Sequence, residues 1–239
     1  MSIDSDFISI TEDSLFTSIQ LNNIEIISCD FDTSLYDIGI FKRYGVTFPD
    51  ELKNAVVKLQ AEFFAGRYIA SLALEKLRVG FESIPIGKHR APVWPEGVAA
   101  SISHSAGKAC CAVTCKHSSE YIGVYIEQWL DVKSIQSIES IIVTKNELIY
   151  LHQLSLDYKI ALILVFSAKE SLFKTIYPRV NFYFDFDAVE IISICTETKT
   201  FRLRLKVKLS NELDEGSLFS GVYFVNENLV GTLVAEDVC

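Results

Sequence analysis

The sequence predicts an α+β protein made of two similar parts, because the same succession of elements occurs twice along the chain. A helical pattern at residues 59–77 precedes strand patterns between residues 99 and 127, and helical patterns at residues 144–177 precede strand patterns between residues 189 and 235. Within the last region, apolar residues alternate with Arg or Lys from residue 201 to 209, as in a half-exposed strand. A composition of 49% hydrophobic and 22% charged residues argues against disorder.

In the first part, residues 24–27 and 38–41 are expected to be strands or short ordered segments. Residues 59–77 repeat apolar side chains at helical spacing. Gly66 lies inside this helix, where glycine costs about 1 kcal/mol relative to alanine, so a close approach of another segment is expected there. Two glycines and three prolines predict a loop at residues 80–95. Strands are then expected at residues 99–103, 109–115 and 121–127, the last two joined by a polar turn at residues 117–120.

In the second part, Thr144 and Glu147 have the spacing of a capping box that opens a helix toward Leu154. A longer helix is predicted from about Asp157 to Tyr177, because Pro178 cannot continue it. Strands are predicted at residues 189–194, 201–209, 221–225 and 229–235, with a hairpin turn at residues 226–228.

The composition also limits the class of protein. A net charge of −9 removes the broad attraction that phosphate-backbone binding needs, so nucleic acid is not an expected partner. The longest uninterrupted apolar run, residues 160–166, is far shorter than the roughly 18 residues of a membrane span. The first residues lack the pattern of a secretory signal, so a cytoplasmic location is expected. A monomer is also expected. The six cysteines include no Cys-x-x-Cys pair, which favours reduced thiols over a zinc site.

Two segments place carboxylates in regular elements. In Phe166-Ser-Ala-Lys-Glu-Ser-Leu-Phe-Lys174, Glu170 and Lys174 are four residues apart on one helix face, with Lys169 on the flank. Taken alone, they fit an exposed helix ion pair. In Gly123-Val-Tyr-Ile-Glu127, the odd-numbered residues share one face of a strand, and Val124 and Ile126 are expected on the opposite, core-facing side.

Three further candidates are weaker by themselves. Ser103 and His104 stand together in Ser101-Ile-Ser-His104, but the chain has no Gly-x-Ser-x-Gly elbow, which disfavours a serine hydrolase. Arg67 follows Gly66, and Arg90 precedes Ala-Pro-Val-Trp-Pro95. Each arginine fits a solvated surface position, and each also suits a phosphate ligand, because a guanidinium group binds phosphate through two hydrogen bonds.

Together and in this order, the five motifs within residues 58–177 resemble the enterobactin-synthesis branch of the phosphopantetheinyl transferases. These enzymes move phosphopantetheine from coenzyme A to a serine of a carrier protein. The resemblance implies two similar α/β halves in a pseudo-twofold arrangement, residues 1–119 and 120–239, with the active site in the cleft between them. It further implies Mg²⁺ as cofactor, coenzyme A as donor and an apo acyl or peptidyl carrier protein as partner.

The resemblance also assigns roles to individual residues. Glu127 and Glu170 would be magnesium ligands, and Glu170 or a metal-bound water would take the serine proton. Lys169 and Lys174 would contact the phosphates and the leaving group. The residues expected to bind coenzyme A are Arg67, Arg90, Ser103, His104 and Lys169.

Tyr125 departs from the family pattern, in which an aspartate that binds magnesium stands at this strand position. A neutral phenol is a poor magnesium ligand. Three outcomes are open: water, Gln128 or Asp131 replaces the ligand, the enzyme is weakened, or the chain is a substituted form of an active parent. The rival hypotheses are a binding module for coenzyme A or carrier protein without efficient transfer, and an unrelated α+β interaction domain.

Overall fold

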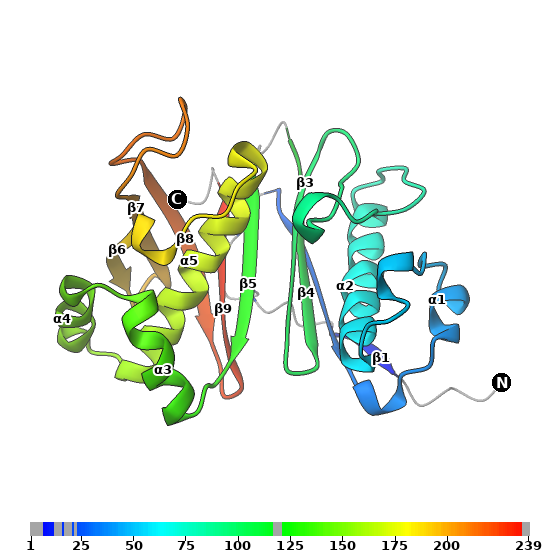
Figure 1. The fold of residues 1–239 in the computed structure, drawn as a ribbon, viewed down its shortest axis with the longest axis horizontal. Helices are drawn as coiled ribbons and strands as arrows, with labels where there is room; N and C mark the ends of the chain where they lie inside the picture. Colours follow the sequence, from blue (N-terminus) through cyan, green and yellow to red (C-terminus); the bar gives the residue numbers. More distant parts are fainter. Residues whose placement is uncertain (1–6, 12–15, 17–20, 22, 117–120, 236–239) are drawn as a thin grey trace. The chain divides into compact units, whose positions relative to one another are not determined.

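The computed structural model describes residues 7–11, 16, 21, 23–116 and 121–235. These residues form two compact units, the first ending at residue 116 and the second beginning at residue 121. Each unit has one antiparallel sheet (Figure 1). Each also has a hydrophobic core of its own. The described chain is therefore a mixed helix and sheet protein, as the sequence predicts.

The first unit is a four-stranded sheet with strand order β1-β2-β4-β3, and one long helix packs against it. Its elements are β1 (Ile8–Thr11), β2 (Glu25–Phe31), α1 (Gly39–Arg43), α2 (Val57–Lys76), β3 (Val98–Ser105), β4 (Lys108–Cys115) and the short 3-10 turns Thr33–Leu35, Asp50–Leu52 and Lys88–Arg90. The predicted helix at residues 59–77 and the strands at residues 99–103 and 109–115 are confirmed. Residues 38–41 enter the short helix α1, and the turn expected at residues 117–120 lies outside the described residues.

Gly66 lies where α2 meets β3. A Cβ atom at this position would come within 3.0 Å of Cγ2 of Ile102. The close approach expected from a glycine inside a helix is therefore confirmed, because even a methyl group would force Ile102 to shift.

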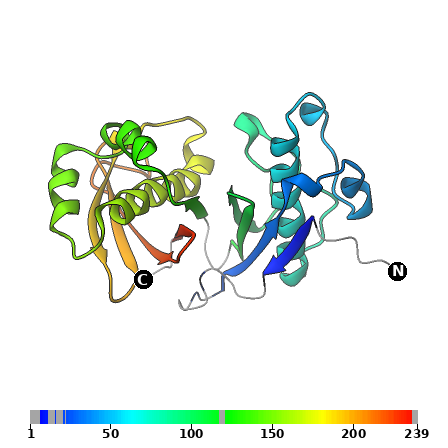
Figure 2. The same cartoon turned by 90° about the horizontal axis from the view of Figure 1, so that it is seen from below.

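The second unit is a five-stranded antiparallel sheet with strand order β5-β9-β8-β7-β6. Its elements are β5 (Ile122–Gln128), α3 (Val132–Ile142), α4 (Lys145–Gln153), α5 (Tyr158–Val180), a 3-10 turn (Phe186–Ala188), β6 (Val189–Cys195), β7 (Thr200–Leu205), β8 (Leu218–Val225) and β9 (Leu229–Ala235). The helix α5 lies against β5 and β9, and α3 and α4 pack against α5. Figure 2 shows these helices, coloured green to yellow, together on one side of the sheet.

The helices of this unit agree with the sequence except for one helix end and one additional helix. The capping box is confirmed, since Thr144 and Glu147 exchange both of its hydrogen bonds. The end predicted before Pro178 is wrong, because α5 continues to Val180 and ends on Asn181, a left-handed residue whose N–H donates to the Tyr177 carbonyl at 2.9 Å. This cap supports the last turn although Pro178 removes one helix hydrogen bond. The helix α3 was not predicted; it begins at Asp131, whose side chain accepts from the Ser134 N–H.

The strand predicted at residues 201–209 is shorter than its alternating pattern. Phe201, Leu203 and Leu205 are buried as expected, but β7 ends at Leu205 and Val207 is exposed. The neighbouring strand β8 begins only at Leu218, which pairs with Arg204. The chain beyond Leu205 therefore has no residue of β8 with which to pair. Alternation alone could not reveal where the partner strand begins.

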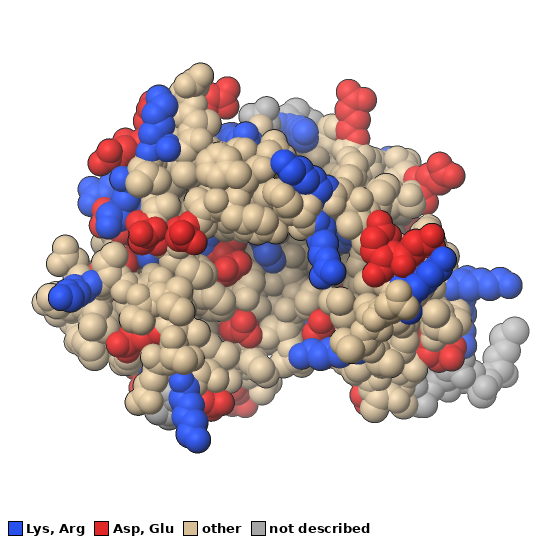
Figure 3. Space-filling model, in the orientation of Figure 1, with Lys and Arg blue, Asp and Glu red and all other residues tan. Residues whose placement is uncertain are grey.

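The hairpin predicted at residues 226–228 joins β8 to β9, and the Asn226 N–H donates to the Leu229 carbonyl at 3.1 Å. In the part of the chain that the structure describes, no helix is long and apolar enough to cross a membrane. Acidic and basic side chains are interspersed over the face shown in Figure 3.

Candidate active site

The contact between β5 and α5 brings two of the sequence motifs together. A Cβ atom on Gly123 would lie only 2.0 Å from the Ser171 carbonyl oxygen, so glycine is what allows the helix to approach this strand. Behind the contact, Thr232 Oγ1 of β9 forms hydrogen bonds with the hydroxyls of Ser167 at 2.8 Å and Ser171 at 2.7 Å. These buried polar groups satisfy one another and fix the helix on the sheet.

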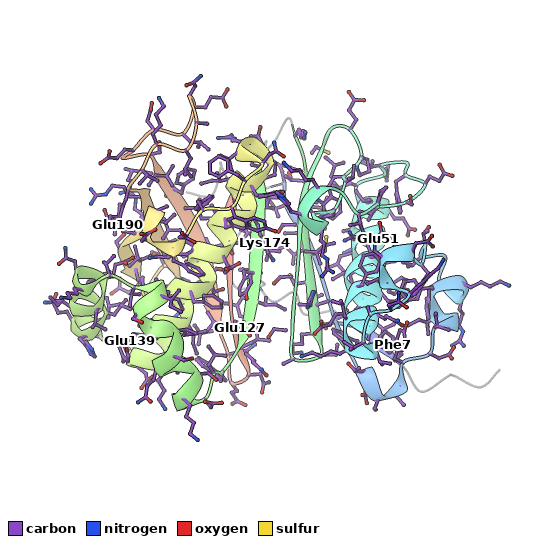
Figure 4. All side chains as sticks on the ribbon, in the orientation of Figure 1. Phe7, Glu51, Glu127, Glu139, Lys174 and Glu190 are labelled. Atoms are coloured by element: carbon purple, nitrogen blue, oxygen red, sulfur yellow. The ribbon has the colours of Figure 1, made fainter. Side chains whose placement is uncertain are left out.

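Tyr125 lies at the centre of this contact. Its hydroxyl donates to Glu127 Oε2 at 3.1 Å. The ammonium group of Lys174 lies 4.9 Å from the centre of the Tyr125 ring, and Lys174 Nζ also donates to the Val124 carbonyl at 3.1 Å. Figure 4 labels both Glu127 of β5 and Lys174 of α5. Burial and the nearby carboxylates Glu127 and Glu170 raise the pKa of Tyr125, so the phenol stays neutral at physiological pH.

The two faces of β5 are the reverse of the expected ones. Glu127 and Gly123 pair with Val230 and Val234, which belong to the core under α5, so the core lies on the Tyr125 face of the strand. Val124 and Ile126, expected to be the core-facing residues, are buried on the opposite face. The sequence could not distinguish the faces, because every residue of this stretch except Tyr125, Glu127 and Gln128 is buried.

Glu170 is a half-buried carboxylate on α5, the helix that also carries Lys174. Burial raises its pKa, and the negative charge of Glu127 raises it further, whereas Lys174 acts in the opposite direction. Both Glu170 and Lys174 are only partly exposed, so they are not the solvated helix pair that their spacing alone suggests. The two phenylalanines of the motif each contact a tyrosine ring: Phe166 contacts Tyr125 with ring centres 5.5 Å apart, and Phe173 stacks on Tyr183.

A pocket of about 190 Å³ adjoins Glu170. Its walls come from α5, from the segment that follows it and from the first residue of β6. They are Lys169, Glu170, Phe173, Tyr183, Phe184, Asp185, Phe186 and Val189. Four of these residues are aromatic, so the pocket is a mainly apolar space with carboxylates at its edge.

Lys169 faces the interior of the second unit. Its ammonium group forms an ion pair of 2.8 Å with Glu147 and donates to the carbonyls of Ile142 at 2.7 Å and Phe186 at 3.2 Å. The side chain is only 1% exposed, and burial lowers its pKa while Glu147 opposes this shift. The sequence indicated a flanking position beside Glu170, but not that three acceptors of the protein itself surround this cation. Its expected contact with phosphate stays a prediction.

The two side chains named as replacements for the missing aspartate lie elsewhere. Asp131 caps α3, accepting from the Ser134 N–H at 2.9 Å. Gln128 follows Glu127 directly, so its side chain points to the other face of β5. Replacement of the aspartate by water is the alternative that stays a prediction.

The two arginines have contrasting surroundings in the first unit. Arg67 on α2 is largely buried: its Nε donates to the Ile84 carbonyl at 3.0 Å and its guanidinium lies 4.7 Å from the Phe63 ring centre. Burial lowers its pKa to about 10, so it remains cationic at neutral pH. Arg90 is exposed at the tip of its loop and has a φ of 64°, directly after His89 with a φ of 53°. Two successive left-handed residues other than glycine indicate local strain.

Ser103 and His104 lie on opposite faces of β3, as neighbours on a strand must. The Ser103 side chain is buried. His104 is on the α2 side, with Nδ1 3.8 Å from a carboxylate oxygen of Glu62, and it is partly accessible. Of this pair, His104 is therefore the side chain that is open to a ligand.

Among the described residues, no group of three or more His, Cys, Asp or Glu side chains is arranged to hold a metal ion. The residues at the contact of β5 and α5 supply two carboxylates, Glu127 and Glu170, which influence each other electrostatically. Mg²⁺ is commonly bound by one or two carboxylates together with substrate phosphates and water. The donor set thus fits Mg²⁺ when a phosphate ligand completes the shell.

The chain is similar in sequence to a known family of proteins. The model of the 4'-phosphopantetheinyl transferase N-terminal domain matches residues 48–114, and that of the 4'-phosphopantetheinyl transferase superfamily matches residues 121–223. The 4'-phosphopantetheinyl transferase Svp of Streptomyces mobaraensis is 30% identical over 195 residues, covering 79% of this chain and 78% of its own length. The chain belongs to the 4'-phosphopantetheinyl transferase superfamily.

The branch within this superfamily follows from other relatives. Enterobactin synthase component D of Salmonella typhi is 37% identical over 146 residues, and that of Escherichia coli strain K12 is 38% identical over 125 residues. These matches cover 61% and 52% of this chain. They support the enterobactin-synthesis branch of the superfamily. The chain spans 59% and 58% of the length of these two relatives.

Two features of this superfamily member were not predicted from the sequence. Glu147 was recognised only as a helix cap, although it also binds Lys169 and accepts the Ile191 N–H at 2.8 Å. The aromatic pocket was missed as well, although the cluster Phe182-Tyr-Phe-Asp-Phe186 was a visible signal. Both features depend on contacts between segments that are distant in the sequence.

Proposed function

We propose that this chain transfers phosphopantetheine from coenzyme A to a serine of an apo carrier protein, with Mg²⁺ as cofactor. The observation that carries the proposal is the convergence of Glu127 on β5 with Glu170 and Lys174 on α5, around Tyr125. Carboxylates that can hold a hard cation thus lie beside a lysine that can face phosphate, as phosphoryl-type transfer requires. Membership in the 4'-phosphopantetheinyl transferase superfamily supports the same reaction.

In the proposed reaction, Glu170 accepts the proton of the carrier serine, and its raised pKa suits this task. The serine oxygen forms a bond to the phosphorus that carries the pantetheine arm. The bond from this phosphorus to the bridging oxygen breaks, and adenosine 3',5'-bisphosphate leaves with its new negative charge next to Lys174. Bound Mg²⁺, held by Glu127 and Glu170, would neutralise the pyrophosphate charge. The protein contributes mainly positioning and charge stabilisation.

The aromatic pocket beside Glu170 suits the pantetheine arm. The arm is a flexible and largely apolar chain attached to phosphate, so one end needs apolar walls and the other needs the charged residues. Phe173, Tyr183 and Phe186 provide such walls, and Glu170 lies at the charged end. This arrangement would orient the reacting phosphorus toward the carboxylates.

The nucleotide part of coenzyme A is proposed to bind residues of the first half of the chain. Arg67, Arg90 and His104 are the candidates, with Ser103 contributing through its strand. The family resemblance supports a shared site for the halves 1–119 and 120–239 in their pseudo-twofold arrangement. Exposed Arg90 and accessible His104 are the side chains best able to reach phosphate oxygens.

The decisive test is to incubate the protein with coenzyme A, Mg²⁺ and several apo carrier proteins, and to weigh each carrier by mass spectrometry. We expect a mass increase of one phosphopantetheine group on at least one carrier. No increase on any carrier, with an active transferase as positive control, would overturn the proposal. The same panel would distinguish carriers for siderophores, other nonribosomal peptides, polyketides and fatty acids.

One observation favours a second candidate function, a binding module for coenzyme A or carrier protein that transfers slowly or not at all. Tyr125 replaces a carboxylate with a neutral donor, and its hydroxyl occupies one oxygen of Glu127. The metal shell is thus poorer than in the family pattern. Calorimetry that detects coenzyme A binding, combined with no transfer in the mass assay, would favour this candidate.

A further inference from the structure

We propose that Lys169 is a positioning residue that fixes the walls of the aromatic pocket beside Glu170, and that it is not a ligand of the coenzyme A phosphates. The proposal rests on the proposed function, because it assigns this pocket to the pantetheine arm. It concerns a buried cation whose partners are all protein groups.

The contacts of Lys169 join four separate elements. Its carbonyl partners are Ile142, the last residue of α3, and Phe186, in the 3-10 turn that forms part of the pocket. Its carboxylate partner, Glu147, lies in the first turn of α4. Each donor hydrogen of the ammonium group therefore has an acceptor within the unit.

Glu147 extends the network to the other side of the pocket. One of its carboxylate oxygens accepts the Thr144 N–H at 2.8 Å, and the other accepts the Ile191 N–H of β6 at 2.8 Å. The strand β6 begins at Val189, which is itself a wall of the pocket. The pair of Glu147 and Lys169 thus connects α5, which carries Glu170, with the two segments that face it across the pocket.

Two roles of Lys169 can be distinguished by measuring ligand binding, because each role would affect the affinity for a different set of ligands. A phosphate ligand would contribute to the binding of coenzyme A and of adenosine 3',5'-bisphosphate, because both carry the nucleotide phosphates. A residue that shapes the pocket would contribute only to the binding of coenzyme A, because the bisphosphate has no pantetheine arm. A lysine that only stabilises the fold would affect neither ligand once the protein is folded.

The informative variant removes both charges together. In Glu147→Gln/Lys169→Met, no unpaired charge is left inside the protein, and the glutamine can still accept one backbone N–H. The side chain of Met has nearly the length of Lys but cannot donate to Ile142 and Phe186. Lys159→Met is the matched control, because Lys159 is an exposed residue of the same helix.

The experiment is calorimetry of both ligands on the full chain in the presence of Mg²⁺, with circular dichroism to establish that each variant is folded. For the double variant we expect coenzyme A to bind about tenfold more weakly, equivalent to about 1.4 kcal/mol, with bisphosphate binding unchanged within twofold. Equal weakening of both ligands would overturn the proposal in favour of a phosphate contact. Unchanged binding of both would overturn it in favour of a purely structural pair.

Two further results keep the test decisive. If the double variant does not fold, the single variant Phe186→Ala, which removes one pocket wall, replaces it. This variant must bind coenzyme A more weakly while its affinity for the bisphosphate stays the same. Equal affinity for coenzyme A in this variant and the wild type would count against the proposal. If the wild-type protein binds neither ligand, the proposed function itself fails. If the wild-type protein binds coenzyme A no more tightly than the bisphosphate, the function stands but the pocket does not hold the arm.

Discussion

Tyr125 connects the two charged side chains nearest to it, because it donates to Glu127 and lies under the ammonium group of Lys174. A phenol at this position costs the site one negative charge relative to the aspartate of the family pattern. In the proposed site, the remaining carboxylates Glu127 and Glu170 would hold Mg²⁺ together with phosphate or water. The identity of this one residue should therefore control the affinity for the metal.

We expect Tyr125→Asp to raise the affinity for Mg²⁺ and the transfer rate together, each by about an order of magnitude, because the number of carboxylates tunes the binding of hard cations. Calorimetry and the carrier mass assay measure the two effects. Tyr125→Asn is the control, since it has the size of aspartate but adds no negative charge, and it should raise both quantities less than Tyr125→Asp does. Tighter metal binding without faster transfer would strengthen the binding-module hypothesis.

Glu170 is expected to lower stability while serving function. Burial raises its folded-state pKa, so the cost of ionising it is absent below the ordinary pKa of glutamate, grows between that value and the raised folded pKa, and is complete above it. We therefore expect Glu170→Gln to be more stable than wild type at pH 7 and equally stable near pH 4. Urea unfolding at both pH values measures this difference.

The same Glu170→Gln variant should lose nearly all transfer activity, because it keeps the shape of the side chain but removes a metal charge and a proton acceptor. The carrier mass assay measures this loss on the folded protein. A variant that retained most of its turnover would show that the helix carboxylate has only a structural role.

At the scale of elements, the site depends on how closely α5 approaches β5. Gly123 leaves room for the Ser171 carbonyl, and the hydroxyls of Ser167, Ser171 and Thr232 hold the helix in place. The pair of Glu147 and Lys169 then ties the far side of α5 to α4 and β6. Glu127 and Glu170 lie on the two elements whose spacing these contacts fix.

We expect Gly123→Ala to destabilise the protein by at least about 1–3 kcal/mol, because the added methyl group would overlap the helix backbone and push α5 from the strand. Thermal or urea unfolding measures the loss. Gly80→Ala is the matched control, since a methyl group there meets open space and φ is not positive, so stability should change by less than about 1 kcal/mol. Equal stability of the two variants would contradict the close approach.

The buried ion pair should show strong non-additivity. Lys169→Met alone leaves Glu147 as an uncompensated buried charge and should cost about 3–5 kcal/mol of unfolding free energy, whereas adding Glu147→Gln should recover a large part of this loss. Urea unfolding of the two single variants and the double variant measures the coupling. Additive effects would mean that the two charges do not act as a pair.

At the scale of the whole molecule, charge affects how a partner can be found. The chain carries a net charge of −9, and its acidic and basic side chains are interspersed on the face seen in Figure 3. An acidic carrier protein would be repelled at long range. Productive encounter must therefore depend on short-range contacts.

We expect kcat/KM for an acidic carrier to stay constant or rise as salt is increased from about 0.01 M to 0.15 M, because the Debye length falls from about 30 Å to about 8 Å and screens the repulsion. Transfer assays at constant Mg²⁺ measure this dependence. The control is the affinity for coenzyme A, measured at each salt concentration. A steep fall of kcat/KM with salt would instead indicate a local basic docking patch.

The sequence by itself determined the elements whose signals are local. The helix at residues 59–77, the capping box of Thr144 and Glu147, and most strands follow from spacing and turn residues that act within a few positions. The motif around Glu170 was also visible in the sequence, through its resemblance to the 4'-phosphopantetheinyl transferases, whose family model matches residues 121–223. The roles of these site residues are part of the proposed function.

Only the tertiary structure decided which side chains meet. It gave Lys169 a buried partner, placed the core on the Tyr125 face of β5, ended β7 where β8 begins, and formed the pocket beside Glu170. Each of these features joins segments far apart in the sequence. Their energies come from burial and from paired charges in a low-dielectric interior, and these terms depend on three-dimensional neighbours rather than on local spacing.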